Sequence, residues 1–298
     1  MSQDRAERPG VLCAGRVYCD LVFTGLPRLP TAGTEIFADD LSLHPGGGAA
    51  ITAAYIAALG RPAFLAAHLP SAPFQAPVAA GLERCGVDLN LSKPSTEPGA
   101  FQLTVAMAHG GDRAFVTRDV GPAVPTLDAA SLRAARIGHL HIGELKTLVE
   151  RPDLLTLARA AGLSVSLDCG WDDALTASVA PLIEAVDLFL PNAEEMARLT
   201  ALGLCPAPRG ATVVKRGAEG SSTPGGPCLP PPAARVVDTT GAGDAFNGGF
   251  LDAWLSGAPL LACQEAGNTC GARAVSHPGG TAGAEALRRA RVEMAALS

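Results

Sequence analysis

One aspartate stands where the chain could bind an anion. Asp244 follows the run Gly241-Ala242-Gly243, and Phe246, Phe250 and Trp254 then recur at the four-residue spacing of one helical face. This pattern predicts a tight turn into a helix whose first N–H groups have no partner inside the helix. Because those donors and the positive end of the helix dipole attract negative charge, the turn is suited to a phosphate group.

A carboxylate in an anion site needs an explanation. Val236 and Val237 read as the end of a short buried strand, which would place the two glycines at a strand-to-helix turn. Glycine has no Cβ atom, so a phosphate could approach this backbone closely. Asp244 fits such a site if it takes a proton from a hydroxyl that attacks the phosphate, which is phosphoryl-transfer chemistry. The alternative is that Asp244 is an ordinary cap or first-turn residue.

The length and composition of the chain limit the classes of protein to which it can belong. The 298 residues fit one large α/β domain or a domain with a small appendage, and the 48% of hydrophobic residues provide a substantial core. The net charge of −6 argues against a nucleic-acid surface. No signal-peptide pattern and no run of 18 apolar residues is present, so we expect a cytoplasmic protein with no membrane partner. The eight cysteines contain no C-x-x-C pair and are expected to be reduced and mostly buried.

The first third of the chain carries a second glycine-rich helix entrance. A strand is predicted at 11–14, and the segment 17–23, which contains Asp20, is expected to be extended. The run His44-Pro45-Gly46-Gly47-Gly48 then opens a helix in which Ile51, Tyr55 and Leu59 share a face, ended by Gly60 and Pro62. Two further strands are predicted within 99–118, joined by a hairpin at His109-Gly110-Gly111-Asp112.

From residue 124 onward, strands alternate with helices, which predicts parallel βαβ units. The expected strands are 137–142, 165–167, 188–190 and 213–214, and the expected helices lie near 127–136, 151–161, 173–185, 193–201 and 262–275. Ligands bind at strand ends in such sheets. The polar residues that follow these strands are Glu144, Asp168, Asn192, Glu195, Lys215 and Arg216.

Two histidines lie within one of the predicted strands. His139 and His141 are two residues apart, so their side chains would face the same side of the strand. Metal binding is one interpretation, but no third ligand has suitable spacing. The favoured interpretation is a pair of buried or pocket-lining histidines.

The thirteen residues Asp238 to Phe250 resemble the second signature of the ribokinase-like (PfkB-type) carbohydrate kinase family. The resemblance extends from Gly15 to about Gly283. It implies an α/β fold of three αβα layers, with a mostly parallel central sheet and a small β lid. It also implies a single domain over 11–298, with lid strands from about 16–40 and 99–118.

The resemblance assigns roles to residues throughout the chain. It implies that Asp244 is the catalytic base and that the N–H groups of 241–243 stabilise the transferred phosphoryl group. Asn192 and Glu195, in an N-x-x-E motif, would organise Mg²⁺ and the phosphates of ATP, largely through water. The other implied contacts are Lys215, Arg216, Gly217, Gly220 and Asn268 with the nucleotide, and Asp20, Gly46, Gly47 and Gly48 with the sugar. Glu144 is a further candidate for a hydroxyl contact, with an ordinary strand-end cap as the alternative.

A monovalent cation such as K⁺ is also implied, near Asp238, Thr240 and the loop 275–280. Lys215 and Arg216 have an alternative interpretation as a solvated basic pair in a turn. The aromatic residues Phe23 and Phe101 could stack on a nucleobase or pack under the lid.

The chain departs from the family pattern in two places. Ile51 occupies a position where members commonly carry an asparagine that contacts substrate hydroxyls, which predicts a less hydroxylated or differently shaped acceptor unless Ile51 is simply core. The proline-rich stretch 221–233 stands where members usually have a pair of strands. Because proline cannot donate to a strand ladder, we expect that hairpin to be short or irregular and the wall of the adenine pocket to differ.

The sequence therefore predicts ATP-dependent phosphorylation of a hydroxyl on a small sugar or sugar-like molecule. The alternatives are a nucleoside kinase of the same fold, or a non-catalytic ligand-binding or regulatory member. A homodimer through the lid is a further implication of the resemblance. A nicotinamide-dependent oxidoreductase is excluded because no G-x-G-x-x-G follows the first strand.

Overall fold

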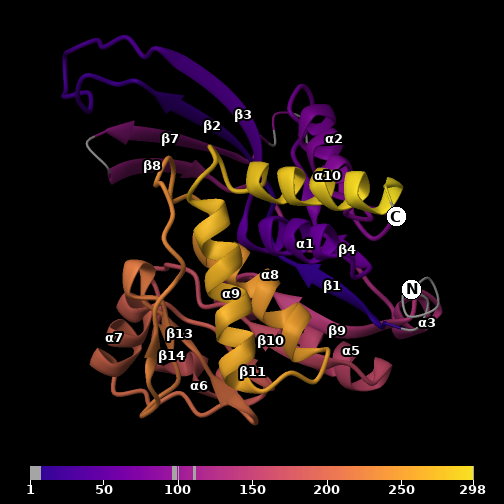
Figure 1. Cartoon of the computed structure of the whole chain (residues 1–298). Helices are drawn as coiled ribbons and strands as arrows, with labels where there is room; N and C mark the ends of the chain where they lie inside the picture. Colours follow the sequence, from indigo (N-terminus) through magenta and orange to yellow (C-terminus); the bar gives the residue numbers. More distant parts are fainter. Residues whose placement is uncertain (1–7, 96–98, 100, 110–111, 298) are drawn as a thin grey trace.

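The computed structural model describes residues 8–95, 99, 101–109 and 112–297. Its centre is a sheet of parallel strands in the order β12-β11-β10-β9-β1-β4 (Figure 1). These strands are β1 (Gly10–Ala14), β4 (Ala63–Ala66), β9 (Ile137–Ile142), β10 (Ser164–Leu167), β11 (Leu188–Phe189) and β12 (Ala211–Thr212). The predicted parallel sheet is confirmed.

Helices cover both faces of this sheet, because neighbouring residues of each strand point to opposite sides. Along β1, Val11 and Cys13 belong to one buried apolar cluster and Leu12 and Ala14 to the other. The first cluster packs under α1 (Gly48–Leu59), α2 (Gln75–Cys85), α8 (Ala242–Trp254), α9 (Leu260–Ala274) and α10 (Ala282–Ala296).

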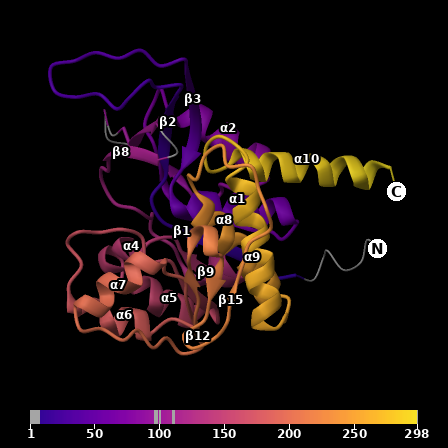
Figure 2. The same ribbon diagram turned by 60° about the vertical axis from the view of Figure 1, so that its left-hand side comes forward.

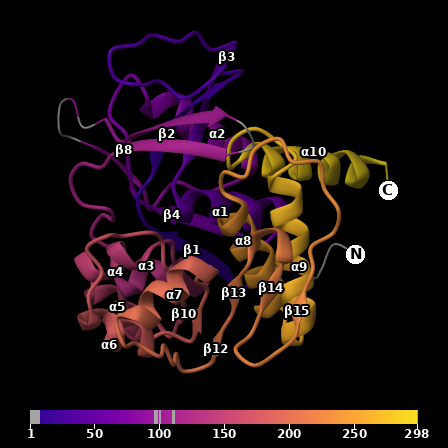
Figure 3. The same ribbon diagram turned by 90° about the vertical axis from the view of Figure 1, so that its left-hand side faces the viewer.

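The second cluster packs under α3 (Ala129–Ala134), α4 (Leu145–Glu150), α5 (Asp153–Ala161), α6 (Ala180–Glu184) and α7 (Ala193–Ala201). Figure 3 shows the two layers, with α3–α6 at the lower left and α8–α10 at the right. The chain is thus a three-layer αβα protein, as predicted.

A separate four-stranded sheet, here called the outer sheet, lies above the central sheet in all three views (Figures 1, 2 and 3). Its strands run in the order β3-β2-β7-β8, where β2 is Tyr18–Thr24, β3 is Asp40–Gly46, β7 is Leu103–His109 and β8 is Asp112–Arg118. The predicted hairpin 99–118 corresponds to β7 and β8, although Gly110 and Gly111 lie outside the described residues.

The two faces of the outer sheet differ in chemistry. One transverse row, across all four strands, consists of His44, Asp20, Thr104 and Thr117. The next row belongs to the opposite face and consists of Leu43, Leu21, Val105 and Val116, which are half-buried or exposed. One face therefore carries the polar group Asp20, and the other is apolar.

Several predicted elements need correction. The strand predicted at 213–214 is only partly present, because Val213 lies between β12 and β13 (Val214–Lys215) and belongs to neither strand. The strand β13 forms a small antiparallel sheet with β14 (Ser221–Ser222) and β15 (Cys228–Leu229), in the order β13-β14-β15. The expected short hairpin is thus present. The buried strand predicted to end at Val236 and Val237 is wrong, because both side chains are more than half exposed and the segment is irregular. Prolines at 230–232 cannot supply ladder donors, which accounts for the irregular path.

Other elements agree with or go beyond the predictions. The strand 137–142 and the helix 193–201 match β9 and α7, and the helix that Gly60 ends is α1. The pattern missed β3, β4, α2, α4 and α10, as well as the small two-stranded sheet of β5 (His68–Leu69) and β6 (Lys93–Pro94). All eight cysteines are free and six are buried, as expected. Among the described residues, no helix is both long and apolar enough to cross a membrane.

Candidate active site

The turn before α8 is built so that only glycine fits at its first position. Gly241 caps the helix with a φ of 71°, in the left-handed region. A Cβ atom on Gly241 would lie 2.8 Å from Gly280 Cα and 2.9 Å from Ile51 Cδ1. The first bond of the helical ladder runs from the Ala245 N–H to the Gly241 carbonyl, at 2.8 Å, so the earlier N–H groups of the turn stand outside that ladder.

Asp244 lies where the N-termini of two helices meet. It is half-buried in the first turn of α8, and a Cβ atom on Gly48 at the start of α1 would be 2.8 Å from its Oδ1. The Thr52 hydroxyl of α1 also donates to the Asp244 carbonyl, at 3.1 Å. Burial raises the pKa of Asp244, the negative charge of Asp168 raises it further, and Lys215 opposes both. Glu144 and Asp20 add to the upward shift, so three other carboxylates act on this one.

The outer sheet supplies Asp20 beside the start of α1. Its side chain is buried, and a Cβ atom on Gly46 would overlap its carboxylate. Gly47 has a φ of 98°, and a Cβ atom there would overlap the Arg16 carbonyl. Burial raises the pKa of Asp20 to about 7, against the opposing effect of a hydrogen bond from Thr104. The glycines are therefore needed so that the backbone can pass close to Asp20 and the strand before it.

Glu144 follows β9, and the residue before it, Gly143, lies against the same helix entrance, because a Cβ atom on Gly48 would be 2.7 Å from the Gly143 carbonyl oxygen. Glu144 Oε1 accepts from the Thr147 hydroxyl at 2.8 Å and from the Arg16 N–H at 3.4 Å. Burial raises the pKa of Glu144 as well. The predicted acceptor residues Asp20, Gly46–Gly48 and Glu144 thus lie together with Asp244.

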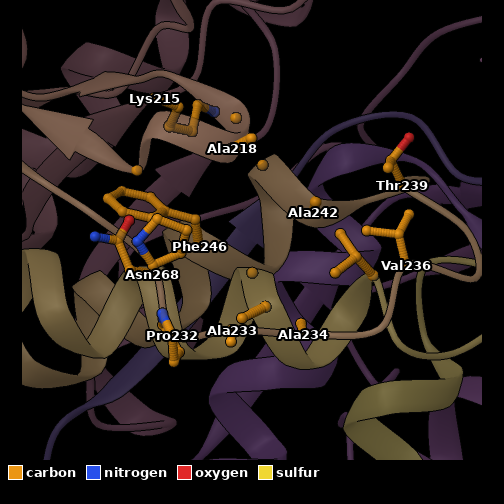
Figure 4. A pocket seen from close by; sticks show the side chains of 17 residues that line it. Lys215, Ala218, Pro232, Ala233, Ala234, Val236, Thr239, Ala242, Phe246 and Asn268 are labelled. Atoms are coloured by element: carbon orange, nitrogen blue, oxygen red, sulfur yellow. The ribbon is translucent and has the colours of Figure 1, made fainter.

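A cavity of about 400 Å³ lies on the other side of the α8 N-terminus (Figure 4). Its lining includes Lys215, Gly217, Gly220, Gly243 and Asn268, five of the residues predicted to contact nucleotide or phosphate. The remaining wall is largely apolar and includes Pro231, Pro232, Ala233, Ala234, Val236, Phe246 and Val275. The proline-rich stretch therefore forms one side of this cavity.

Asn268 and Arg216 have structural partners. The Asn268 amide donates to the Leu229 carbonyl at 2.8 Å and so ties α9 to β15 beside the cavity. Arg216 is exposed, donates to the Ser222 hydroxyl at 2.8 Å and is absent from the lining of the cavity.

Lys215 is buried in a polar cluster rather than solvated. Its Nζ lies 2.6 Å from Asp168 Oδ2 and 3.3 Å from Asn247 Oδ1, and Asn247 also donates to Asp168 at 2.5 Å. Although burial lowers the pKa of Lys215, the negative charges of Asp168, Glu195 and Asp244 raise it above its usual value. The link between Asp168 and Asn247 was missed, because Asn247 reads in sequence only as a residue within a helix.

Asn192 and Glu195 form a capping box at the start of α7. The Glu195 N–H donates to Asn192 Oδ1 at 2.8 Å, and the Asn192 N–H donates to Glu195 Oε2 at 2.7 Å. Burial and the negative charge of Asp168 raise the pKa of Glu195, with Lys215 opposing. The backbone of Asn192 forms an isolated parallel β-bridge with the backbone of Lys215. The N-x-x-E motif therefore lies beside the buried cluster that contains Lys215.

The Asp238 carboxylate joins two loops. Its Oδ1 accepts from the Thr240 N–H and hydroxyl, at 2.9 and 2.7 Å, and its Oδ2 accepts from the Gly279 N–H at 2.8 Å. The Val275 carbonyl accepts from the N–H groups of Val237 and Asp238. The residues predicted for a monovalent cation are therefore neighbours.

The remaining candidates lie elsewhere or in the core. The rings of His139 and His141 bond to the hydroxyls of Ser164 and Ser166, at 2.7 to 2.9 Å, and no cluster of metal-binding side chains occurs in the described part of the chain. Ile51 is buried against Gly241 and Gly280, which fits its interpretation as core. Phe101 packs edge to face against Phe74, with ring centroids 5.6 Å apart.

Residues 11–287 match the model of the pfkB family of carbohydrate kinases. The chain is 30% identical over 301 residues to an ATP-dependent ribose-1-phosphate kinase from Halopiger xanaduensis. This match covers 94% of this chain and 94% of the relative. It is 28% identical over 207 residues to a fructoselysine 6-kinase from Shigella flexneri, covering 66% of this chain and 77% of the relative.

Solved structures share the fold. A ribokinase from Cryptococcus neoformans var. grubii serotype A, in complex with ADP, superposes with a TM-score of 0.76 at 21% identity. The match covers 95% of this chain and 100% of that chain.

Proposed function

The chain belongs to the pfkB family of carbohydrate kinases, and we propose that it transfers the terminal phosphoryl group of ATP to a hydroxyl of a small sugar or sugar-like molecule, with Asp244 as the base. One observation carries this proposal. The Asp244 carboxylate lies between the nucleotide-sized cavity at the start of α8 and the cluster of Asp20 and Glu144 at the start of α1.

The proposed reaction uses this placement. Asp244 accepts the proton of the acceptor hydroxyl while that oxygen bonds to the terminal phosphorus and the bond to the departing ADP breaks. The N–H groups at 241–243 stabilise the charge on the transferred phosphoryl group. Asp20 and Glu144 orient the acceptor by accepting hydrogen bonds from its other hydroxyls.

The residues beside the cavity fit a magnesium nucleotide. The cavity has a volume typical of small-molecule sites, and Ala242 and Gly243 in the first turn of α8 line it. Glu195 would supply a carboxylate for Mg²⁺, largely through water, and nucleotide oxygens and further waters would complete the shell of the ion. Bound Mg²⁺ would neutralise phosphate charge.

Asp238 and Thr240, with carbonyls near Val275, are proposed to bind a monovalent cation. A comparison of turnover in K⁺ with turnover in tetramethylammonium would test this proposal.

Replacing the proposed base tests the function. Asp244→Asn should lower kcat by about 10²–10⁴-fold, because a positioned base contributes roughly that factor, while ATP still binds. ADP release with Mg²⁺-ATP and a panel of sugars and nucleosides measures the first quantity, and calorimetric titration with ATP measures the second.

Asp153→Asn is the matched control, because Asp153 also lies in the first turn of a helix, α5, but pairs with Arg151 away from the site. An Asp244→Asn protein with undiminished kcat would contradict the assignment. Binding of acceptors without turnover across the panel would favour a non-catalytic member, and a preference for nucleosides would favour the nucleoside kinase.

A further inference from the structure

A second cavity, of about 500 Å³, lies at the far end of α1 from the active site. It is formed where α10, the yellow helix near the mark C in Figure 1, packs against the C-terminal ends of α1 and α2. The other end of α1 is at the active site, because a Cβ atom on Gly48 would lie 2.8 Å from Asp244 Oδ1. Since α1 has 12 residues, about 18 Å of helix separates the two places.

Three arginines, Arg61, Arg288 and Arg291, make the polar part of this cavity. Arg288 and Arg291 are three residues apart on α10, so their side chains are neighbours on one side of that helix. None of the described residues that line the cavity is acidic. Because arginine is ionised at every physiological pH, the lining brings positive charge from two separate parts of the chain.

The two arginines of α10 also cap helices. Arg288 Nη1 donates to the Glu83 and Arg84 carbonyls in the last turn of α2, at 3.1 and 2.7 Å. Arg291 Nη1 donates to the Ala58 carbonyl in the last turn of α1, at 2.5 Å. Among the described residues, Arg288 makes hydrogen bonds through Nη1 alone, so the donors on its Nε and Nη2 are available to a ligand.

Positive charge around the cavity exceeds negative charge. Arg61 bonds to Asp252 at 2.8 Å, but Arg8 shares the same carboxylate at 3.0 Å. The C-terminal end of α2 offsets only roughly half of the charge on Arg288. Glu285, one turn before Arg288, pairs with two other arginines. A positive excess therefore remains even before the second arginine of α10 is counted.

The rest of the cavity suits a carbon skeleton. Its wall there is apolar and includes Ala57, Pro62 and Val292, and its volume is in the range of small-molecule sites. A guanidinium group can pair with a phosphate through two parallel N–H groups. A phosphate monoester carries roughly 1.5 to 2 negative charges at pH 7, so it gains more from this excess of cations than a carboxylate does.

We propose that this cavity binds a phosphorylated small molecule, whose phosphate bonds to Arg288 and whose carbon skeleton packs against the apolar wall. The charges of Arg61 and Arg291 stabilise the same phosphate. The site is separate from the ATP cavity and from the acceptor cluster, and it does not depend on the proposed function. A purely structural role of the arginines predicts, by contrast, that no phosphorylated compound binds here.

Calorimetric titration of the intact chain tests the proposal. The nucleotide cavity is first saturated with Mg²⁺ and a non-hydrolysable ATP analogue, and D-glucose 6-phosphate, D-ribose 5-phosphate and AMP are then titrated. D-Glucuronate, which has a carboxylate at the carbon that carries the phosphate in D-glucose 6-phosphate, is the comparison. We expect at least one of the three phosphates to bind with a Kd below about 1 mM, and D-glucuronate to bind at least about tenfold more weakly than that phosphate.

Two variants assign the bound phosphate to this cavity. Arg288→Gln removes the available donors, and Val292→Glu adds a carboxylate at an exposed position of the wall. Each should weaken binding by at least about tenfold, because hydrogen bonds between charged groups are strong. Arg133→Gln is the matched control. Arg133 also donates to a carbonyl in the last turn of a helix, Ala160 of α5, at 2.9 Å, but it does not line the cavity, so its loss should leave binding unchanged.

The outcomes separate a ligand site from a structural role. Binding that both cavity variants weaken and the control does not supports the proposal. The proposal is overturned if none of the three phosphates binds, if D-glucuronate binds as tightly as the best of them, or if binding survives either variant in a folded protein. Thermal unfolding reports on folding, and Val292→Glu decides the question if Arg288→Gln loosens α10, because Val292 is exposed.

Discussion

The charges around Asp244 set the pH dependence expected of the free enzyme. A base works when deprotonated, so kcat/KM should rise with pH through the pKa of Asp244. Because that pKa is raised, the rise of kcat/KM on the acid side of the pH profile should be centred well above the ordinary aspartate pKa of about 3.9. Asp168→Asn removes one of the negative charges responsible and should move this rise to lower pH by about one unit. A pH profile of kcat/KM measures this, and an unmoved rise would mean that Asp168 does not act on the base.

The buried Lys215–Asp168 pair should matter for stability. Lys215→Met leaves Asp168 buried without its cation, which typically costs about 3–5 kcal/mol. Arg84→Met breaks the exposed pair with Glu285 and should cost at most about 1 kcal/mol. Urea unfolding compares the two free energies, and equal losses would contradict the role of burial.

At the scale of elements, the entrance of α8 depends on backbone shape. Gly241→Ala would force a side chain into the left-handed region and against Gly280 and Ile51, so both stability and kcat/KM should fall. Gly162 at the end of α5 has a similar φ of 74° but open space around it. Gly162→Ala should therefore cost only the backbone strain, about 1–2 kcal/mol, with activity retained. Steady-state kinetics and thermal unfolding of both variants measure the difference, and equal kcat/KM values would show that the turn tolerates displacement.

Local patterns predicted the elements with strong periodicity and missed those that depend on distant partners. The β9 strand and the helices α1 and α7 could be read from apolar spacing and glycine signals. By contrast, β3 ends in Leu43-His44-Pro45-Gly46, which looks like a loop until its pairing with β2 is known. The prediction of a strand at Val236 and Val237 failed because the local signal was misleading. Two β-branched residues suggest a strand, but the preceding prolines prevent one. In the site, the glycine turns carried a local signal, whereas the contact of Asp168 with Asn247 depends on packing between β10 and α8.

At the scale of the whole molecule, the outer sheet presents an apolar face that one chain leaves partly uncovered. Leu41 and Leu43 are 46% exposed and Val116 is 64% exposed. We expect a homodimer through this face, because large exposed apolar patches mark association surfaces. Val116→Lys should shift the protein towards monomer in sedimentation experiments, whereas Val149→Lys, at a 50% exposed site on α4, should not. A wild-type protein that is monomeric at micromolar concentration would contradict this prediction.

The helix α1 is apolar on nearly every side, with nine of its residues, from Ala49 to Ala58, buried. Among the segments that pack against it are α8 and α10, which come from the last quarter of the chain. During synthesis, therefore, this helix emerges long before those two partners do. Once residue 60 has been synthesised, the nascent chain carries an apolar helix that stays exposed until the C-terminal segments leave the ribosome. We expect the protein to depend most on chaperones during that interval.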